Sequence, residues 1–126
     1  MHHNTKRILK MFRIRLIREF LELVILKYLI EQNRVSGYDL MRQINEDYGV
    51  LLSPGTIYSK LYTLEGKGLI KEEWTKKRRE YIITQKGRLA ISEFLNDPVG
   101  KKFLNLLEKS METYIKTLTV QKMRCD

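Results

Sequence analysis

Two groups of side chains in the middle of the chain have the chemistry to contact a polyanion. The first is a run of four cations, Lys76, Lys77, Arg78 and Arg79. Four adjacent like charges repel one another. Binding to phosphates neutralises them and releases counterions, so such a run favours binding to a polyanion. The second group carries hydroxyls and one amine at helical spacing: Ser53, Thr56, Ser59, Lys60 and Thr63. Such side chains bind phosphates or base edges, so the two groups together predict nucleic-acid binding.

The second group falls on a predicted helix. Ser53 is its expected N-cap and Pro54 its first residue, and Gly66 and Gly68 close it. Its inward stripe, spaced i, i+4, i+7, is Ile57, Leu61 and Leu64. The hydroxyl-bearing residues then face outward, with Tyr58 and Tyr62 as their neighbours.

Each group also has a plainer interpretation. A run of cations keeps the edge of a hairpin soluble, and a polar helix face is often only solvated. Solvated helix faces usually hold more Glu and Lys than Ser, Thr and Tyr, so we favour DNA contact for both groups. Lys86 and Arg88 either extend the cationic patch or belong to ordinary surface.

Composition agrees with a polyanionic partner. The chain has 126 residues, of which 43% are hydrophobic, enough for one packed domain with a helical appendage. Lys and Arg number 24 against 15 Asp and Glu, a net charge of +9. A basic protein of this size most often meets DNA, RNA or an anionic membrane surface. The positive charge is concentrated in residues 1–18 and 53–90.

Several other classes are disfavoured. A lone cysteine, Cys125, excludes an internal disulfide, and the adjacent His2 and His3 do not make a metal site. The most apolar stretch, 14–30, contains five charged residues and is not expected to span a membrane. Without a recognisable signal peptide, the expected location is cytoplasmic. No phosphate-binding loop, dinucleotide motif or nucleophile with a base is present, so we expect neither an enzyme nor a cofactor.

Apolar periodicity predicts two helices before the third. The segment 16–32 lacks Gly and Pro and is apolar nearly all round, so its helix should be buried on more than one side. Ser36 is the expected N-cap of a helix over 37–48, which Gly49 should end.

After the third helix, the pattern changes to short strands. Strands over 69–74 and 80–83 are expected to flank a basic turn over 75–79. Helices should follow from Thr84 to about Asn96 and over 99–123. Three helices and a basic hairpin predict a mostly α fold with a small β-hairpin wing, a winged helix-turn-helix plus a long C-terminal helix. In that fold the third helix can enter a major groove while the wing reaches the flanking backbone.

The two ends of the chain suggest further roles. Residues 1–16 are expected to form a basic arm or helix, which either touches the DNA backbone, touches a partner subunit or stays mobile. Residues 17–96 are expected to form the DNA-binding domain, and residues 97–126 a dimerisation helix. An apolar stripe runs along this last helix: Phe103, Leu107, Met111, Tyr114 and Leu118. It should pair with a second copy, since a two-fold dimer suits two half-sites; alternatively it folds back on its own first helix.

Four motifs in order resemble one family. They are residues 36–40 (Ser-Gly-Tyr-Asp-Leu), 53–58 (Ser-Pro-Gly-Thr-Ile-Tyr), 64–70 (Leu-Glu-Gly-Lys-Gly-Leu-Ile) and 78–87 (Arg-Arg-Glu-Tyr-Ile-Ile-Thr-Gln-Lys-Gly). Together they resemble the PadR-type transcriptional regulators in their short form. The resemblance implies a homodimeric winged-helix repressor that a small molecule releases from DNA. Ser59 and Glu80 depart from the family's usual Pro and Tyr.

The function that follows is sequence-specific binding of double-stranded DNA by a homodimeric regulator, a repressor by family resemblance. The effector, if there is one, is unidentified, and no membrane partner is expected. Two alternatives stay open: a winged-helix module that binds another protein, and an architectural DNA binder without sequence preference.

Overall fold

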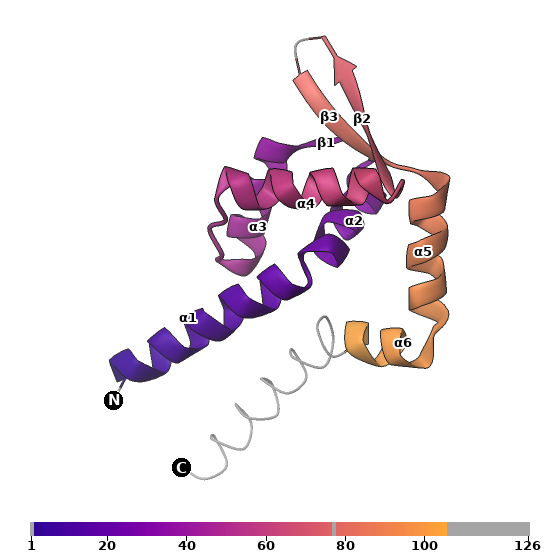
Figure 1. Ribbon diagram of the computed structural model, residues 1–126. Helices are drawn as coiled ribbons and strands as arrows, with labels where there is room; N and C mark the ends of the chain where they lie inside the picture. The colour runs from indigo at the N-terminus through magenta and orange to yellow at the C-terminus, as the bar shows by residue number, and fades with distance from the viewer. Residues whose placement is uncertain (1, 77, 106–126) are drawn as a thin grey trace. The chain divides into compact units, whose positions relative to one another are not determined.

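The computed structural model of the protein describes residues 2–76 and 78–105. Its elements follow one another as α1 (His2–Glu19), α2 (Leu21–Gln32), β1 (Val35–Ser36), α3 (Gly37–Tyr48), α4 (Pro54–Gly66), β2 (Ile70–Thr75), β3 (Arg78–Ile83), α5 (Gln85–Asn96) and α6 (Pro98–Asn105) (Figure 1). The chain forms two compact units, Met1–Arg88 and Leu89–Asp126. The first unit contains the three helices and the hairpin expected of a winged helix-turn-helix, which confirms the mostly α fold with a small β-hairpin wing. The long C-terminal helix expected over 99–123 lies mostly outside the described residues.

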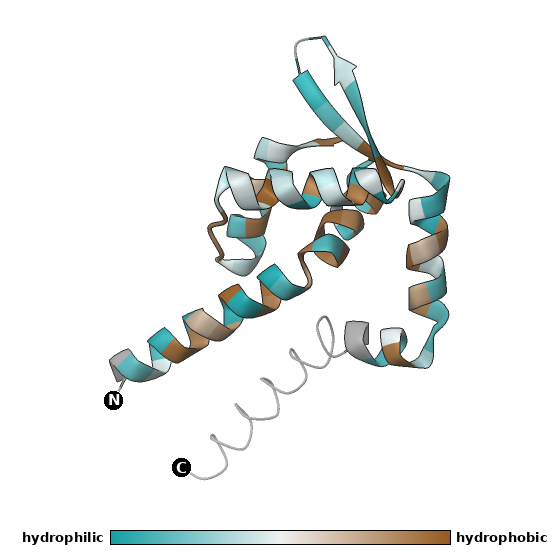
Figure 2. Cartoon of the chain, viewed as in Figure 1, coloured by the Kyte–Doolittle hydropathy of each residue, from teal (hydrophilic) through white to brown (hydrophobic). Residues whose placement is uncertain are grey.

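The core of the first unit lies between α2, α3, α4 and the base of the sheet. The predicted inward stripe of α4 is fully buried, with Ile57, Leu61 and Leu64 each at 0% exposure. Helix α2 is buried along more than one side, as its composition predicted, and adds residues such as Leu21 and Leu29. Apolar residues also occupy the base of the hairpin, whereas its outer part is polar (Figure 2).

The predicted helix caps are confirmed. Ser36 Oγ accepts a hydrogen bond from Asp39 N at 3.1 Å at the start of α3, and Gly49 ends that helix in the left-handed region at φ 66°. Ser53 caps α4, and Pro54 is its first residue. These caps fix where the two helices of the helix-turn-helix begin and end.

The sheet has three antiparallel strands in the order β1-β3-β2. Strand β1 was not predicted: Val35 pairs with Tyr81 and Ser36 with Glu80. The predicted five-residue turn over 75–79 is wrong, since β2 continues to Thr75 and β3 begins at Arg78. Two of the four cations therefore belong to the strand pair, since Arg79 pairs with Trp74 and Arg78 with Thr75. Lys76 lies in the turn, with φ 56°.

The predicted start of the first apolar helix at residue 16 is also wrong. Helix α1 contains the whole basic N-terminal segment that is described and runs on to Glu19. The break lies at Phe20, with φ −105° and ψ 22°, and α2 begins one residue later. Phe20 N still donates to Leu16 O at 3.0 Å, and Val24 N donates to Phe20 O at 3.1 Å, so the break is a bend and not a loop.

A buried phenol ties α2 to α3. The Tyr28 hydroxyl donates to the Asp47 carboxylate, and Gln43 O lies 3.5 Å away. Burial, followed by this hydrogen bond and the Asp47 charge, raises the pKa of Tyr28 well above its usual value. The folded protein therefore keeps this phenol protonated at a pH where the unfolded chain ionises it.

A pH dependence of stability follows for Tyr28. Its contribution is complete below the unfolded pKa of about 10 and is lost as the pH rises above it. The free energy of unfolding should therefore fall between about pH 9 and about pH 11, and Tyr28→Phe, with no phenol to ionise at this position, should reduce this fall, leaving the part due to the buried Tyr81. Urea unfolding followed by circular dichroism measures it. The exposed-tyrosine variant Tyr62→Phe should keep the wild-type fall, and equal falls in all three proteins would contradict the assignment.

Candidate nucleic-acid interface

The first turn of α4 brings two of the predicted residues together. Ser53 Oγ accepts a hydrogen bond from Thr56 N at 3.2 Å and shares a second with Thr56 Oγ1 at 2.9 Å. Beside them Gly55 is exposed, and a Cβ built there would meet only Ser53 Oγ at 4.0 Å. A phosphate or a base edge can therefore approach the helix backbone closely at its positive end.

The next turns of α4 carry an exposed polar face. Ser59 and Thr63 are exposed, and Thr63 Oγ1 donates to Ser59 O at 3.0 Å. Tyr62, between them in sequence, is 81% exposed. Lys60 lies on the flank toward α2, where Glu22 is 3.7 Å from its amine and also binds Lys67 at 3.3 Å. The amine of Lys60 is thus partly neutralised, while Ser59 and Thr63 remain exposed to solvent.

Tyr58 lies where α3, α4 and the hairpin meet. It is 39% exposed, and its ring lies so close to Gly37 that a Cβ there would come within 2.7 Å of it. The Arg79 guanidinium lies 6.0 Å from the centre of the Tyr58 ring and 5.5 Å from that of Tyr81. One arginine of β3 thus contacts aromatic rings from α4 and from its own strand.

Arg79 is also held by Glu72 on β2, at 2.8 Å. Burial lowers the pKa of Arg79, but the hydrogen bond to Glu72 and the charges of the neighbouring acidic groups together outweigh it, so that this pKa lies above its usual value. Burial raises the pKa of Tyr81, against the opposing influence of the Arg79 cation. Both side chains therefore keep the protonation states that the stack requires at neutral pH.

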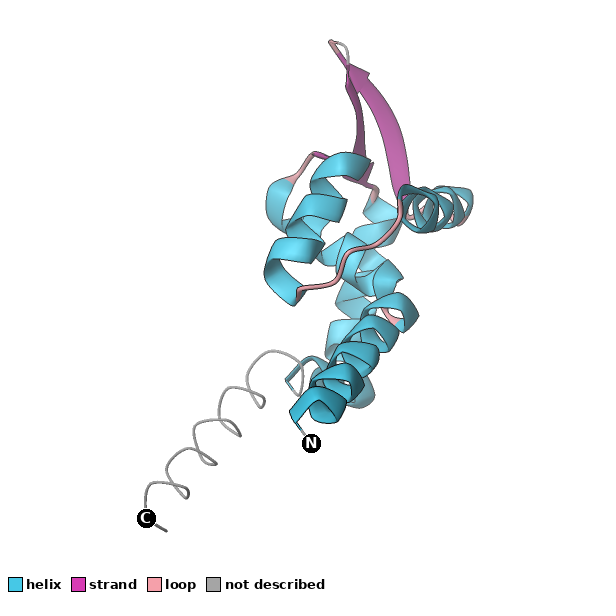
Figure 3. Cartoon of the chain, turned by 90° about the vertical axis from the view of Figure 1, so that its left-hand side faces the viewer, coloured by secondary structure: helices cyan, strands magenta, loops and turns pink. Residues whose placement is uncertain are grey.

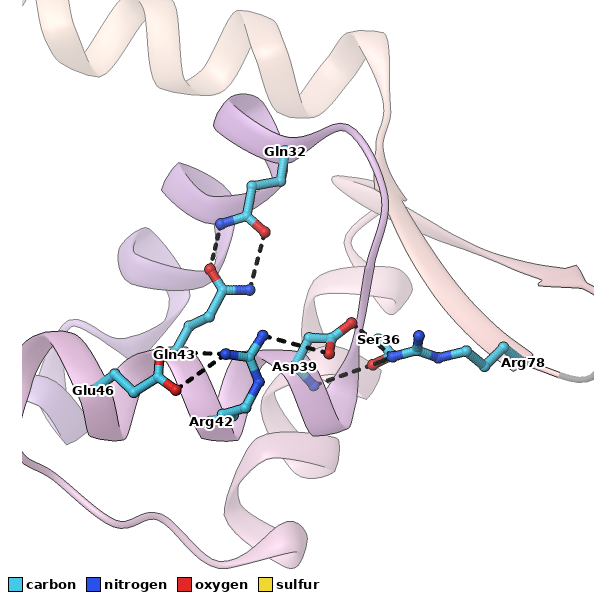
Figure 4. Close-up of polar contacts among 7 residues, drawn as sticks. All are labelled: Gln32, Ser36, Asp39, Arg42, Gln43, Glu46 and Arg78. Carbon is cyan, nitrogen blue, oxygen red and sulfur yellow. Dashed lines mark hydrogen bonds and ion pairs between the residues drawn. The ribbon is translucent and has the colours of Figure 1, made fainter.

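Arg78 joins the hairpin to the start of α3 (Figure 4). Its Nη2 donates to Ser36 Oγ at 2.8 Å and to Asp39 Oδ2 at 2.7 Å. Asp39 also lies 3.8 Å from Arg42, which pairs with Glu46 at 3.1 Å. The expectation of four uncompensated cations is therefore wrong for Arg78 and Arg79, because each has a carboxylate partner.

The hairpin projects beyond the helices of its own unit (Figures 1 and 3). Lys76 stands exposed at its turn, and it has no ion pair within the described part of the chain. Trp74, in the last part of β2, is 68% exposed. The outer hairpin thus combines positive charge with one large apolar ring.

The comparisons with known proteins agree with this geometry. The model of the transcriptional regulator PadR-like family matches residues 25–93, which is more than half of the chain. The chain belongs to the PadR-like family. The family resemblance and the winged-helix fold expected from the sequence are thereby confirmed. No curated protein sequence matches the chain.

Solved structures share the PadR-like fold. A transcriptional regulator from Clostridium thermocellum is 25% identical, with a TM-score of 0.57 over 81% of this chain and 93% of that one. A PadR family transcriptional regulator from Eggerthella lenta is 23% identical, with a TM-score of 0.62 over 89% and 96%. PadR from Bacillus subtilis, solved in complex with operator DNA, is 20% identical, with a TM-score of 0.54 over 82% and 70%.

Some predicted residues of this PadR-like chain fall outside the described structure. Lys77 is one, and nothing is described beyond the backbone for Phe103. The rest of the predicted dimer stripe, Leu107, Met111, Tyr114 and Leu118, also lies outside the described residues. Within the described residues, no cluster of His, Cys, Asp or Glu could hold a metal ion. None of the described helices has both the length and the apolarity to cross a bilayer.

The residues that position the cations of this PadR-like domain were not among the predicted site residues. Glu72 and Asp39 were not assigned to the site, although they bind Arg79 and Arg78. A signal for Glu72 existed, since a strand pair places opposite charges on one face within diagonal reach. No comparable signal existed for Asp39, because its pairing depends on the unpredicted contact of β1 with β3.

Proposed function

We propose that the protein is a sequence-specific DNA-binding repressor that acts as a homodimer. The observation that carries the proposal is the stack of Arg79 on Tyr58, which fixes the hairpin on α4. A constant position of the helix relative to the wing is needed, because the helix contacts bases in the groove while the wing contacts the flanking backbone. The fold relative from Bacillus subtilis, crystallised with operator DNA, supports the same use of this fold.

In this proposal, α4 enters the major groove. Its contacts to base edges and phosphates come from Ser53, Thr56, Ser59, Lys60, Tyr62 and Thr63. Tyr58 supports the wing while its exposed edge reaches the backbone. Lys76 and Lys77 bind phosphates directly. Arg78 and Arg79 add positive charge near the backbone while keeping the carboxylate partners that orient them.

The dimer is supported by an apolar stripe on α1. Four large side chains at helical spacing are each about half exposed: Ile8, Met11, Phe12 and Leu16. They continue into a shallow groove of about 700 Å³ at the α1–α2 bend, lined in part by Phe12, Leu16 and Phe20. Exposed apolar surface of this kind is typical of an interface. In our proposal a second copy covers it, using the C-terminal segment whose sequence carries the complementary stripe.

The DNA-binding proposal is tested by selecting bound duplexes from a genomic fragment pool. A repressor should enrich one inverted repeat. Equal retention of all fragments would instead indicate an architectural binder, and no retention at low salt would indicate a protein-binding module. Either result contradicts sequence-specific repression.

The wing is tested separately through the salt dependence of binding. Lys76→Ala combined with Lys77→Ala should weaken binding to all duplexes alike and lower the slope of log Kd against log salt by about 2, since each phosphate contact contributes about 0.9. Fluorescence anisotropy with a labelled duplex at several salt concentrations measures both quantities. As a control, Lys101→Ala with Lys102→Ala removes the same charge from exposed positions on α6 that do not belong to the proposed dimer stripe. If both double variants change the slope equally, the wing has no specific contact.

A further inference from the structure

We propose that Trp74 is a DNA-contacting residue of the hairpin, whose indole lies against the deoxyribose-phosphate backbone beside the groove that α4 reads. The inference rests on the proposed function and adds a contact that charge alone does not supply. It concerns the one tryptophan of the chain.

The strand register places Trp74 on the face of the hairpin that packs on the helices. Trp74 pairs with Arg79, Glu72 with Tyr81 and Ile70 with Ile83. Directly paired residues of antiparallel strands lie on the same face, and every second residue shares it. The inner part of this face is buried, with Ile70 and Tyr81 each at 1% exposure.

At its outer end the same face is open and adjoins α4. Arg79, the cross-strand partner of Trp74, lies 6.0 Å from the ring of Tyr58, which belongs to α4. Trp74 itself is 68% exposed. A ligand that covers the exposed side of α4 and continues along the hairpin therefore meets the indole next.

The charges around Trp74 identify the ligand as a polyanion. The acids of the hairpin are already engaged: Glu72 with Arg79, Glu73 with Arg34 at 2.8 Å and Glu80 with the Thr75 hydroxyl. Lys76, two residues beyond the indole, is exposed and carries its charge into solvent. An acidic partner is favoured at this tip and a basic one is opposed.

Among polyanions, the indole favours a nucleic-acid backbone, and the proposed function makes that nucleic acid duplex DNA. Its ring needs an apolar surface, and its N–H needs an acceptor. The sugar-phosphate backbone presents both side by side, since deoxyribose carbons alternate with phosphate oxygens. The neighbouring cations bind the same phosphates, so one ligand satisfies all the groups at the tip.

Because no other tryptophan is present, intrinsic fluorescence reports on this site alone. Full-length protein is titrated with its selected duplex, while anisotropy of a labelled copy of that duplex measures binding independently. We expect the tryptophan emission to change and to saturate at the same duplex concentration as the anisotropy. Trp74→Ala should raise Kd about 10-fold, since the apolar contact and the N–H hydrogen bond are both lost, and Trp74→Phe about threefold, since only the N–H hydrogen bond is lost. The salt slope should stay unchanged, unlike that of the lysine variant, because no charge is removed.

A matched control is Leu89→Ala, which trims an exposed apolar side chain on α5 and should leave Kd unchanged. Circular dichroism checks that all variants fold. If the anisotropy shows binding while the emission stays constant and Trp74→Ala binds like wild type, the contact is disproved and the proposed function stands. If wild-type protein binds no duplex, both are disproved.

Discussion

Gly87→Ala should destabilise the protein more than a Gly→Ala substitution at any other glycine of the first unit. A Cβ at Gly87 would lie 2.2 Å from Leu69 O and 2.7 Å from Ile83 Cγ1. The carbonyl cannot easily retreat, because it accepts a hydrogen bond from Thr84 N at 3.0 Å. We expect a loss of about 3 kcal/mol or more, the upper range for overpacking, and a fall in Tm of about 10 °C or more.

Thermal unfolding by circular dichroism measures this effect, and Gly66→Ala is its control. Gly66 is the last residue of α4, and no heavy atom lies within 4 Å of a Cβ built there. Alanine should therefore be neutral or stabilise by about 0.5–1 kcal/mol. Equal Tm values for the two variants would mean that the start of α5 does not cross the backbone of Leu69 so closely.

Phe12→Glu combined with Leu16→Glu should abolish the proposed dimer and, with it, most of the proposed DNA affinity. Both side chains are about half exposed on the α1 stripe and line the groove at the bend. Two carboxylates in an apolar interface lose hydration without gaining partners, so the copies should separate. A monomer holds one half-site, and losing the second should weaken binding to the full inverted repeat about 100-fold or more.

Light scattering after size exclusion measures the mass, and anisotropy measures the affinity. Asn45→Glu with Gln85→Glu adds the same charge at exposed positions outside α1 and should leave the mass unchanged. If the α1 variant keeps the wild-type mass, the stripe is not the interface. If wild-type protein is monomeric at micromolar concentration, the homodimer proposal is wrong.

Local physical rules account for the parts of the fold that sequence could predict. The caps at Ser36 and Ser53 and the left-handed Gly49 require only neighbouring residues. The inward stripe of α4 depends only on helical periodicity. These features defined the helix-turn-helix and therefore the face on which the candidate hydroxyls lie.

The missed features depend on tertiary contacts. Strand β1 has two residues and exists because Val35 and Ser36 pair with β3, more than forty residues later. The bend at Phe20 occurs in a segment without Gly or Pro, so no local signal announced it. The partners of Arg78 and Arg79 come from α3 and β2, which a linear charge count cannot include.

The same division applies to the candidate site. The hydroxyl-bearing face of α4 was predictable because helix geometry fixes which residues share a side. It was not predictable which of the four cations form ion pairs, because this depends on which carboxylates the fold brings close to each arginine. The structure distinguishes Lys76, which is exposed and without an ion pair among the described residues, from the two arginines that orient the hairpin.

The hydroxyl of Ser36 restricts how this domain can change over generations. It receives Asp39 N from its own helix and the guanidinium of Arg78 from the hairpin. Alanine or valine would remove the acceptor of both hydrogen bonds and leave Arg78 with Asp39 alone, so both bonds are kept only by another small side chain that carries an acceptor oxygen. A mutation at this position therefore alters the start of α3 and the hairpin together, so one site sets a shared limit on substitution in both regions.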